Sequence, residues 1–501
     1  MGNGYFSDIH VVEEKTISEL LTLLEEGAAT SKELVLAYLE RIAKIDKSGP
    51  TLNSIAEINP DAAALAEVRD AQRKKGEIIG PLHGIPVVIK DNIDSGDKMH
   101  TTAGSIALRD HYAGEDAFVV KKLKAAGAII LGKANLTEWA NFIAIGMRNG
   151  FSSRGGAVLN CYGPGRFDVG GSSSGPAVAA GANLAACGIG TETSGSIIMP
   201  AALASCVGIK PSIGLISRTG IIPLSFTQDT AGPICRTVED AALMLGVLVG
   251  EDEKDPITWF AKDWEGHDYT QYLDRDALKG AKLGFLREGY FERLDEEGAR
   301  IVESALGVLK NAGAKIVDPV KNYKAAEMAP VLISMKGGLD VNVLYHEFKV
   351  ALNAYLARVE PHLPVHSLRE LVEFNLANKE TALKYGQAHL EKADLTDGSL
   401  ASLEYFNSRM QDERVCGEES IDRALDEYGL DALVYPNYYA QTVAARVGYA
   451  SITVPAGYSS GIGPVSITFV GRKFDEPGLI RLAYAYEQAS KVRKPPVFDV
   501  E

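Results

Sequence analysis

The chain has 501 residues, of which 46% are hydrophobic and 23% are charged. This composition is typical of a globular protein that buries a sizeable core. The formal net charge of −15 at pH 7 argues against general binding to nucleic acids or anionic membranes, because both would repel an acidic surface.

In chain order, the sequence first predicts three helices. Apolar residues recur at helical spacing over 16–26 and 31–42, and a third helix is predicted over 61–75. Each of these helices has an apolar face to bury. We therefore expect residues 1–75 to form a helical layer against the rest of the protein.

Short β-branched runs then alternate with helical patterns. Strands are predicted at 86–90, 128–131, 282–286, 315–317, 432–435 and 451–454, and helices at 117–126, 298–312 and 479–489. Residues 319–428 are mainly helical in pattern and are expected to form an insertion or cap. Because no linker divides the chain, we predict one α/β domain over 1–501, a twisted mixed β-sheet between layers of helices.

The sequence shows no sign of export, membrane insertion or metal binding. Residues 1–15 lack the basic and apolar segments of a secretory signal, and no apolar run is long enough to cross a bilayer. Five cysteines without CxxC spacing fit reduced thiols, and nine histidines show no metal-ligand spacing. We expect a cytoplasmic monomer or homodimer that has no metal or cofactor and binds neither nucleic acid nor membrane.

The segment 170–200 carries the strongest chemical signal. It reads GGSSSGPAVAAGANLAACGIGTETSGSIIMP, two Gly/Ser-rich turns on either side of a run of small residues. Glycine lets backbone N–H groups approach a bound atom closely. The run 176–186 starts with proline and continues with good helix formers, so it predicts a buried helix with a serine turn at each end.

Lys90 is the second signal, because a charge at the end of the apolar run 86–89 is unusual. Burial there would disfavour the charged amine and lower its pKa from about 10.4 toward neutral pH. A neutral lysine can take a proton from a serine hydroxyl, which is otherwise a poor nucleophile. Two serines and this lysine could together carry out acyl transfer without histidine.

These motifs resemble the amidase signature family. The similarity rests on VVIKDNID around Lys90, followed in order by GGSSSG, GTETSGSIIMPA and QDTAGP. It is dense over 84–236, within an expected catalytic core at 80–240, and weaker elsewhere. In the motifs GTETSGSI and QDTAGP, the residues are most similar to those of peptide amidases and related linear-amide hydrolases. The A subunits of glutamyl-tRNA amidotransferases usually read DTGGSIR and SLDQIGP at these places.

The resemblance implies a role for individual residues. Lys90 is the terminal base, Ser172 is a bridging serine that follows a cis peptide bond, and Ser196 is the nucleophile. The two serines are 24 positions apart, which is the interval in the family. The backbone N–H groups that form the oxyanion hole are those of Thr193, Ser194, Gly195 and Ser196. The implied reaction hydrolyses a small-molecule or peptide amide to an acid and ammonia or an amine, through an acyl-enzyme.

Residues 139–156 and the later helical half are expected to line the substrate pocket. Trp139, Phe142 and Phe151 offer aromatic surface for an apolar acyl chain. Met199 stands where some family members that bind acidic substrates have an arginine. Without that cation an uncharged group is expected near the acyl carbon.

Three other functions stay open. GxSxG at 171–175 matches the nucleophile elbow of a Ser-His-Asp esterase, with Ser173 as nucleophile, although 161–169 reads as a loop and not as the required strand. An amidotransferase A subunit would pass its ammonia to a partner, and a silent binding protein would hydrolyse nothing. Glu192 and Asp229 either tune the charge of the site or hold its loops.

Overall fold

A computed structural model describes residues 9–323 and 342–498 of the chain. The start of the segment tested for a secretory signal (1–8) and part of the expected cap (324–341) lie outside the described residues.

One large mixed sheet forms the centre of the protein. Within the described residues it has eleven strands in the order β1-β3-β2-β6-β8-β7-β12-β13-β11-β9-β10, and β4 and β5 form a separate hairpin. The strands are β1 (Ile55–Ile58), β2 (Pro86–Lys90), β3 (Ile129–Ala134), β4 (Phe151–Ser152), β5 (Gly156–Ala157), β6 (Cys187–Glu192), β7 (Val207–Lys210), β8 (Thr230–Cys235), β9 (Lys282–Phe285), β10 (Lys315–Val317), β11 (Ala432–Pro436), β12 (Ser451–Ser459) and β13 (Gly463–Val470).

The sheet combines two parallel groups with an antiparallel centre. β2 pairs in parallel with both β3 and β6, and β9 pairs in parallel with both β10 and β11. The strands β6, β8, β7, β12, β13 and β11 are joined by antiparallel pairs. The predicted mixed sheet is confirmed, and the strand–helix–strand unit β9–α9–β10 lies where the sequence predicts it.

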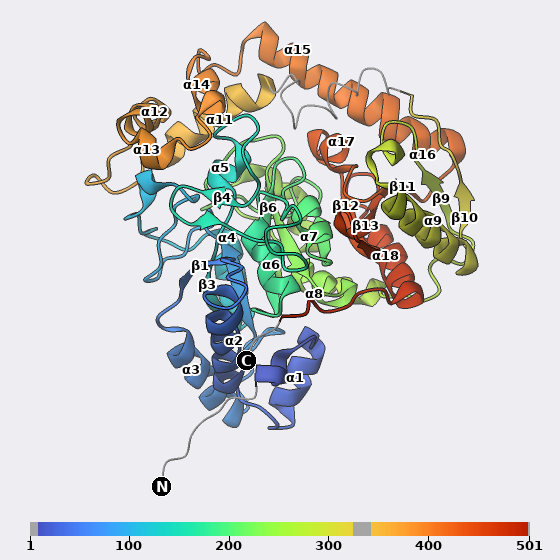
Figure 1. Ribbon diagram of the computed structural model, residues 1–501, viewed down its shortest axis with the longest axis horizontal. Helices are drawn as coiled ribbons and strands as arrows, with labels where there is room; N and C mark the ends of the chain where they lie inside the picture. The colour runs from blue at the N-terminus through green and yellow to red at the C-terminus, as the bar shows by residue number, and fades with distance from the viewer. Residues whose placement is uncertain (1–8, 324–341, 499–501) are drawn as a thin grey trace.

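Helices cover the sheet and extend beyond it. They are α1 (Ile17–Glu25), α2 (Ser31–Arg41), α3 (Ala62–Lys74), α4 (Phe118–Ala125), α5 (Glu138–Asn141), α6 (Ser174–Gly181), α7 (Ile198–Leu203), α8 (Val238–Leu248), α9 (Glu296–Asn311), α11 (Asn342–Leu356), α12 (Leu368–Ala377), α13 (Lys379–Ala382), α14 (Ala388–Asp394), α15 (Leu403–Asp412), α16 (Arg423–Tyr428), α17 (Gln441–Arg446) and α18 (Glu476–Ser490). The N-terminal helices α1–α3 and the helices α11–α14 lie at opposite ends of the molecule (Figure 1).

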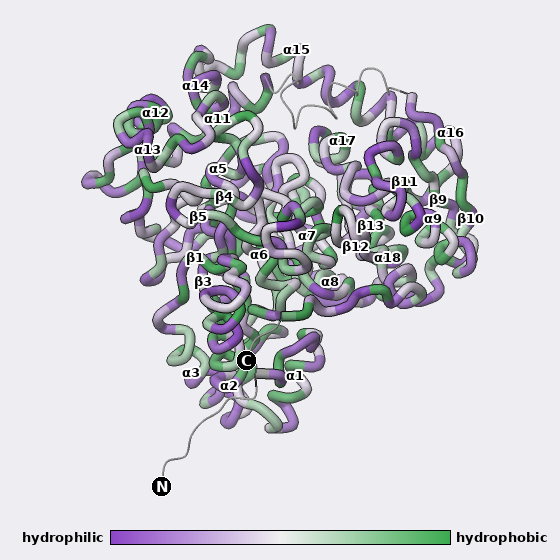
Figure 2. The backbone as a smooth tube through the Cα atoms, viewed as in Figure 1, coloured by the Kyte–Doolittle hydropathy of each residue, from purple (hydrophilic) through white to green (hydrophobic). Residues whose placement is uncertain are grey.

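Capping explains where the first helices begin. Thr16 and Thr30 each accept the N–H of a glutamate three residues later, and that glutamate's carboxylate accepts the threonine N–H in return. Such reciprocal capping satisfies backbone donors that a helix start leaves without partners. The apolar faces of α1 and α2 then pack into a continuous core that also contains the central strands. The tube is mostly hydrophobic through this centre and more hydrophilic outside (Figure 2).

Two local predictions are wrong. The helix predicted over 176–186 ends at Gly181, and Cys187–Glu192 forms β6, every residue of which is buried. The two serine turns are therefore separated by a helix and a strand, not by one helix. The predicted N-terminal helical layer also contains an edge strand, β1, which pairs with β3. Among the described residues, no helix is both long enough and apolar enough to cross a bilayer.

Candidate active site

Strand pairing brings Lys90 next to the residues that precede Ser196. Lys90 ends β2, and the parallel pairing of β2 with β6 sets Ile89 opposite Ile189. Both strands therefore end at the same edge of the sheet, where Thr191 follows shortly after. The carboxyl ends of parallel strands are the usual place for catalytic side chains in such sheets.

The Lys90 amine is fully buried and bound to hydroxyl groups. Nζ donates to Ser172 Oγ at 2.7 Å, to Thr191 Oγ1 at 2.8 Å and to the Thr191 carbonyl at 3.3 Å. Burial lowers the pKa of Lys90 to about 7, against the opposing charges of Asp229 and Glu192. At this pKa a substantial share of the amine is neutral near pH 7 and can accept a proton.

Ser172 lies directly beside the Ser196 segment. The Gly171–Ser172 peptide bond is cis, and the carbonyl of Ser172 accepts the N–H of Thr137 at 3.0 Å. The next N–H, that of Ser173, donates to the carbonyl of Ser196 at 3.1 Å. Two segments 24 positions apart in the sequence thus meet through a direct backbone contact.

Glu192 holds the turn that presents Ser196. One of its carboxylate oxygens accepts the N–H groups of Ile197 and Ile198, at 2.7 and 3.0 Å. Burial raises the pKa of Glu192, while the nearby Lys210 amine and these N–H groups lower it. Gly195 has φ +90°, and a Cβ there would lie 2.4 Å from the Gln441 side chain. The turn therefore requires glycine at this position.

The same turn leaves backbone donors without partners. Within residues 9–323 and 342–498, the N–H groups of Ser194 and Ser196 donate to no protein acceptor. Thr193 is fixed by Asp229, whose carboxylate accepts its hydroxyl at 2.5 Å and also the N–H groups of Leu224 and Ser225. Asp229 and Glu192 thus both hold loops, and both also act on the pKa of Lys90 through their charge.

The hydroxyls of Ser172 and Ser196 are not joined by a hydrogen bond within the part of the chain that the structure describes. The Ser196 residue is 7% exposed, so it keeps a small accessible face, whereas Ser172 is fully buried. Catalytic contacts of this kind often tighten only when substrate binds.

Ser173, the nucleophile of the esterase alternative, is occupied by the backbone. Its hydroxyl donates to the Thr191 carbonyl at 3.0 Å and accepts the Thr191 N–H at 3.1 Å. The side chain is completely buried. This arrangement ties α6 to the end of β6 and leaves the hydroxyl no free direction for attack.

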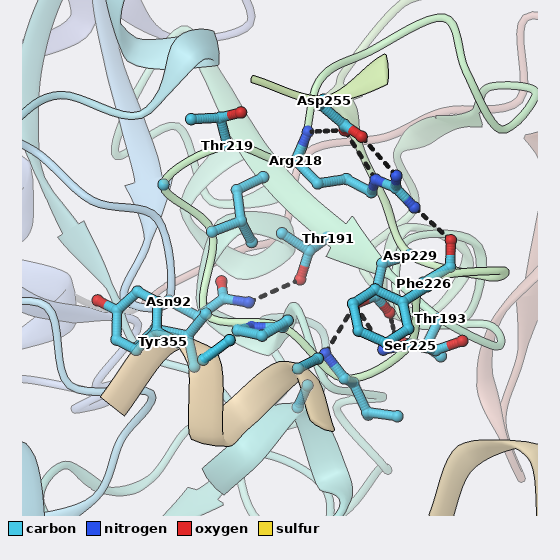
Figure 3. A pocket seen from close by; sticks show the side chains of 18 of the residues that line it. Asn92, Thr191, Thr193, Arg218, Thr219, Ser225, Phe226, Asp229, Asp255 and Tyr355 are labelled. Carbon is cyan, nitrogen blue, oxygen red and sulfur yellow. Dashed lines mark hydrogen bonds and ion pairs between the residues drawn. The ribbon is translucent and has the colours of Figure 1, made fainter. Parts of the chain in front are cut away.

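A cavity of about 560 Å³ lies against this cluster. Its walls include Asn92 and Thr191, which contact the Lys90 site, together with Thr193, Asp229 and the loop 218–226. Tyr355 of α11 and Asn92 lie on one side of it, and Arg218 with Asp255 on another (Figure 3). The volume is within the range, roughly 300–1,000 Å³, of cavities that bind small organic ligands.

The aromatic residues expected at the substrate pocket pack beside this cavity and do not line it. Trp139 and Phe142 belong to an apolar cluster shared with α11. Phe142 stacks on His389 with ring centroids 4.8 Å apart, and Phe151 packs edge-on against Tyr385. Met199 is buried in α7. Of the range 139–156, only Ala140 is among the cavity residues.

Ala140 belongs to an unusual turn. Trp139, Ala140 and Asn141 have φ values of 50°, 54° and 70° in succession. For a residue other than glycine, this left-handed conformation costs roughly 1–2 kcal/mol of conformational free energy. Such conformations persist where the surroundings enforce them, and they are often found at ligand sites.

Sequence reasoning missed Thr191 and Asn92. Thr191 Oγ1 accepts from both Lys90 Nζ and Asn92 Nδ2, the latter at 3.1 Å. Both residues lie within the quoted motifs, Asn92 two positions after Lys90 and Thr191 five positions before Ser196. This closeness in the sequence was the signal that could have pointed to them. Among the described residues, no three side chains of metal-ligand type lie together.

Comparison with known proteins identifies the class. The Amidase family model matches residues 33–480. A probable amidase of Arabidopsis thaliana is 39% identical over 97% of this chain and 92% of its own length. The solved peptide amidase of Stenotrophomonas maltophilia is 41% identical, with a TM-score of 0.89 over 97% of this chain and 99% of that one.

A third relative is the glutamyl-tRNA(Gln) amidotransferase A subunit of Thermoanaerobacter pseudethanolicus. It is 31% identical over 96% of this chain and 97% of its own length. The chain therefore belongs to the amidase family, as the motifs indicated. It is an amide-hydrolysing enzyme with the α/β fold of its solved relatives.

Proposed function

We propose that the chain hydrolyses a linear carboxylic amide to the acid and ammonia or a small amine, with Ser196 as nucleophile, Ser172 as bridge and Lys90 as base. The substrate is a small-molecule or peptide amide, and the working form is a cytoplasmic monomer or homodimer. The observation that supports the proposal most strongly is the buried Lys90 amine, 2.7 Å from the Ser172 hydroxyl, with its pKa lowered to about 7.

In the proposed acylation, Ser196 Oγ attacks the amide carbonyl carbon while its proton passes to Ser172 Oγ. The Ser172 proton passes at the same time to neutral Lys90 Nζ. The relay then runs backward and delivers one proton to the departing nitrogen, so that ammonia or an amine leaves and the acyl-enzyme remains. Water attacks the ester by the same relay and releases the acid.

The developing oxyanion would be bound by the backbone N–H groups of 193–196. The unpartnered donors of Ser194 and Ser196 support this assignment. One donor of this type contributes about 3–4 kcal/mol to transition-state stabilisation when it is fixed before the reaction. Glu192 and Asp229 hold the two sides of this turn through several N–H and O–H contacts.

The amidotransferase A subunit is the second candidate, because relatives with that name cover nearly the whole chain. In that function the amide is still hydrolysed, but the ammonia is delivered to a partner. The motif GTETSGS and the similarity to the solved peptide amidase favour an enzyme that is active without a partner protein.

The test is ammonia release by the purified chain from N-blocked amino acid amides and simple aryl amides. We expect turnover without any partner, and losses of about 100-fold or more in kcat/KM for Ser196→Ala, Ser172→Ala and Lys90→Met. Unchanged turnover in these three variants would rule out the proposed relay. Turnover that appears only when the amidotransferase's partner proteins are added would instead support the second candidate.

A further inference from the structure

The cavity beside the Lys90 cluster changes in character from its floor to its rim. Its floor holds the buried residues Asn92, Thr191 and Thr193, which are 2%, 7% and 6% exposed. Its wall is largely apolar and includes Ile222, Leu224 and Ala351. Its rim contains the exposed cations Lys254 and Arg358.

The floor contains a polar atom that lacks a partner. Asn92 donates from Nδ2 to Thr191 Oγ1 at 3.1 Å, but its Oδ1 is buried and accepts no hydrogen bond within the described residues. A buried acceptor of this kind costs free energy unless a ligand or water supplies a donor. Asn92 lies two positions after Lys90 and lines the cavity (Figure 3). The floor thus suits a ligand group that carries N–H.

Most charged residues of the cavity already have partners. Arg218 donates from Nε and Nη2 to the two oxygens of Asp255, at 2.8 and 2.5 Å. The Asp229 carboxylate accepts hydrogen bonds from the Thr193 hydroxyl and from two backbone N–H groups. Lys254 lies 3.3 Å from Glu115.

Arg358 is the exception. Its guanidinium forms no direct ion pair or side-chain hydrogen bond within residues 9–323 and 342–498, although it lines the cavity just past the end of α11. Its charge acts at longer range on the buried Asp94 carboxyl, whose pKa it lowers against the effect of burial. In a chain with a net charge of −15, an unpaired cation at the rim of an otherwise charge-balanced cavity is well placed to attract an anion. Guanidinium groups bind carboxylates strongly, by two parallel hydrogen bonds where the geometry allows.

We propose that the enzyme prefers amides that carry a carboxylate at the end distant from the scissile bond, and that Arg358 binds this carboxylate. The amide N–H groups face the Asn92 end, the apolar body lies along the wall, and the anionic end reaches the rim. This inference rests on the proposed function. The inference adds a preference for negative charge at the distant end of the substrate. The expectation of an uncharged group near the acyl carbon is unchanged.

Three amides of matched size test the preference. N-succinyl-phenylalaninamide ends in a carboxylate, N-pentanoyl-phenylalaninamide is neutral, and N-(4-aminobutanoyl)-phenylalaninamide ends in an ammonium. We expect kcat/KM to fall in that order. The anionic amide should exceed the neutral one by about threefold to fivefold, because a solvent-exposed ion pair contributes up to about that factor. Added salt should reduce the difference.

Variants assign the effect to one residue. Arg358→Gln should bring the anionic and neutral amides to the same kcat/KM, and Arg358→Lys should keep most of the preference. Arg275→Gln is the matched control, because Arg275 is exposed, forms no ion pair within the described residues and does not line the cavity. Equal turnover of the three amides by the wild type would overturn the inference, as would a preference that survives Arg358→Gln.

Calorimetric binding separates this inference from the proposed function. If the neutral amide is hydrolysed but no charge preference exists, only the inference fails. If no amide is hydrolysed, the proposed function fails, and binding of N-succinyl-phenylalaninamide to the wild type decides the inference. Binding that weakens about threefold or more in Arg358→Gln supports the carboxylate site, and absence of binding refutes it.

Discussion

Replacing Lys90 by methionine should inactivate the enzyme and yet stabilise its fold below neutral pH. The lysine is fully buried, and burial lowers its pKa from 10.5 to about 7. Between these values the unfolded chain binds a proton that the folded chain does not hold, so the wild type gains stability as pH rises from about 7 to 10.5. At about 1.36 kcal/mol per tenfold change, the lysine costs the fold roughly 4–5 kcal/mol below pH 7.

Methionine has a similar shape and no charge to bury. Its introduction leaves the Ser172 and Thr191 hydroxyls without the amine that they now bind, which costs about 1–3 kcal/mol. The net effect is a gain of about 1–4 kcal/mol at pH 6 that shrinks as pH approaches 10.5. Loss of the general base should at the same time lower kcat/KM by about 100-fold to 10,000-fold.

Scanning calorimetry at pH 6 and pH 9 measures the first effect, and ammonia release measures the second. Lys90→Met should melt above the wild type at pH 6, with a smaller difference at pH 9. Ser196→Ala is the control, because it abolishes activity but keeps the lysine and should show no pH-dependent gain. A Lys90→Met variant that melts below the wild type at pH 6, or keeps a tenth of the activity, would refute this reasoning.

Two further substitutions test neighbouring contacts. Asp229→Asn removes a negative charge that raises the pKa of Lys90, so the midpoint of the pH–rate profile should move to lower pH. The value of kcat should fall about tenfold, because the contact with Thr193 weakens. A fall in kcat without a change in the midpoint would show that Asp229 only holds the loop. Ser173→Ala removes a hydroxyl bound to both backbone groups of Thr191, so the melting temperature should fall by the equivalent of about 1–3 kcal/mol while fluorophosphonate labelling persists. Loss of labelling in a folded Ser173→Ala protein would favour the esterase alternative.

Lys90, Ser172 and Ser196 could be singled out from the sequence because they stand in short, distinctive motifs. Lys90 was recognisable as a charge at the end of an apolar run, and the structure places its amine on Ser172. Thr191 and Asn92 were missed because a threonine or an asparagine in such a motif is compatible with many structural roles and does not by itself indicate a contact with the site. The pairing of β2 with β6 was needed to show that Thr191 reaches both Lys90 and Asn92.

The fold was predictable where the patterns were regular. The unit β9–α9–β10 follows from alternating strand and helix periods, and it was found. Strand β6 was not predicted, because its residues are small and buried on both faces, so neither the helical nor the strand period is visible. β8 escaped prediction for a similar reason, since it contains glycine and proline within a fully buried strand. The carboxylate site proposed at Arg358 depends on a cavity, which no local pattern reveals.

The rate at which a fluorophosphonate labels Ser196, followed against pH, tests the central claim most directly, because this step needs the nucleophile and its base but no leaving amine. We expect the rate to rise with the loss of a single proton at a midpoint near pH 7, peptide mapping to find the label on Ser196, and Lys90→Met to lose the fast reaction. A rate in the wild type that does not change between pH 5 and pH 9, or a label found elsewhere, would contradict a neutral Lys90 acting through Ser172.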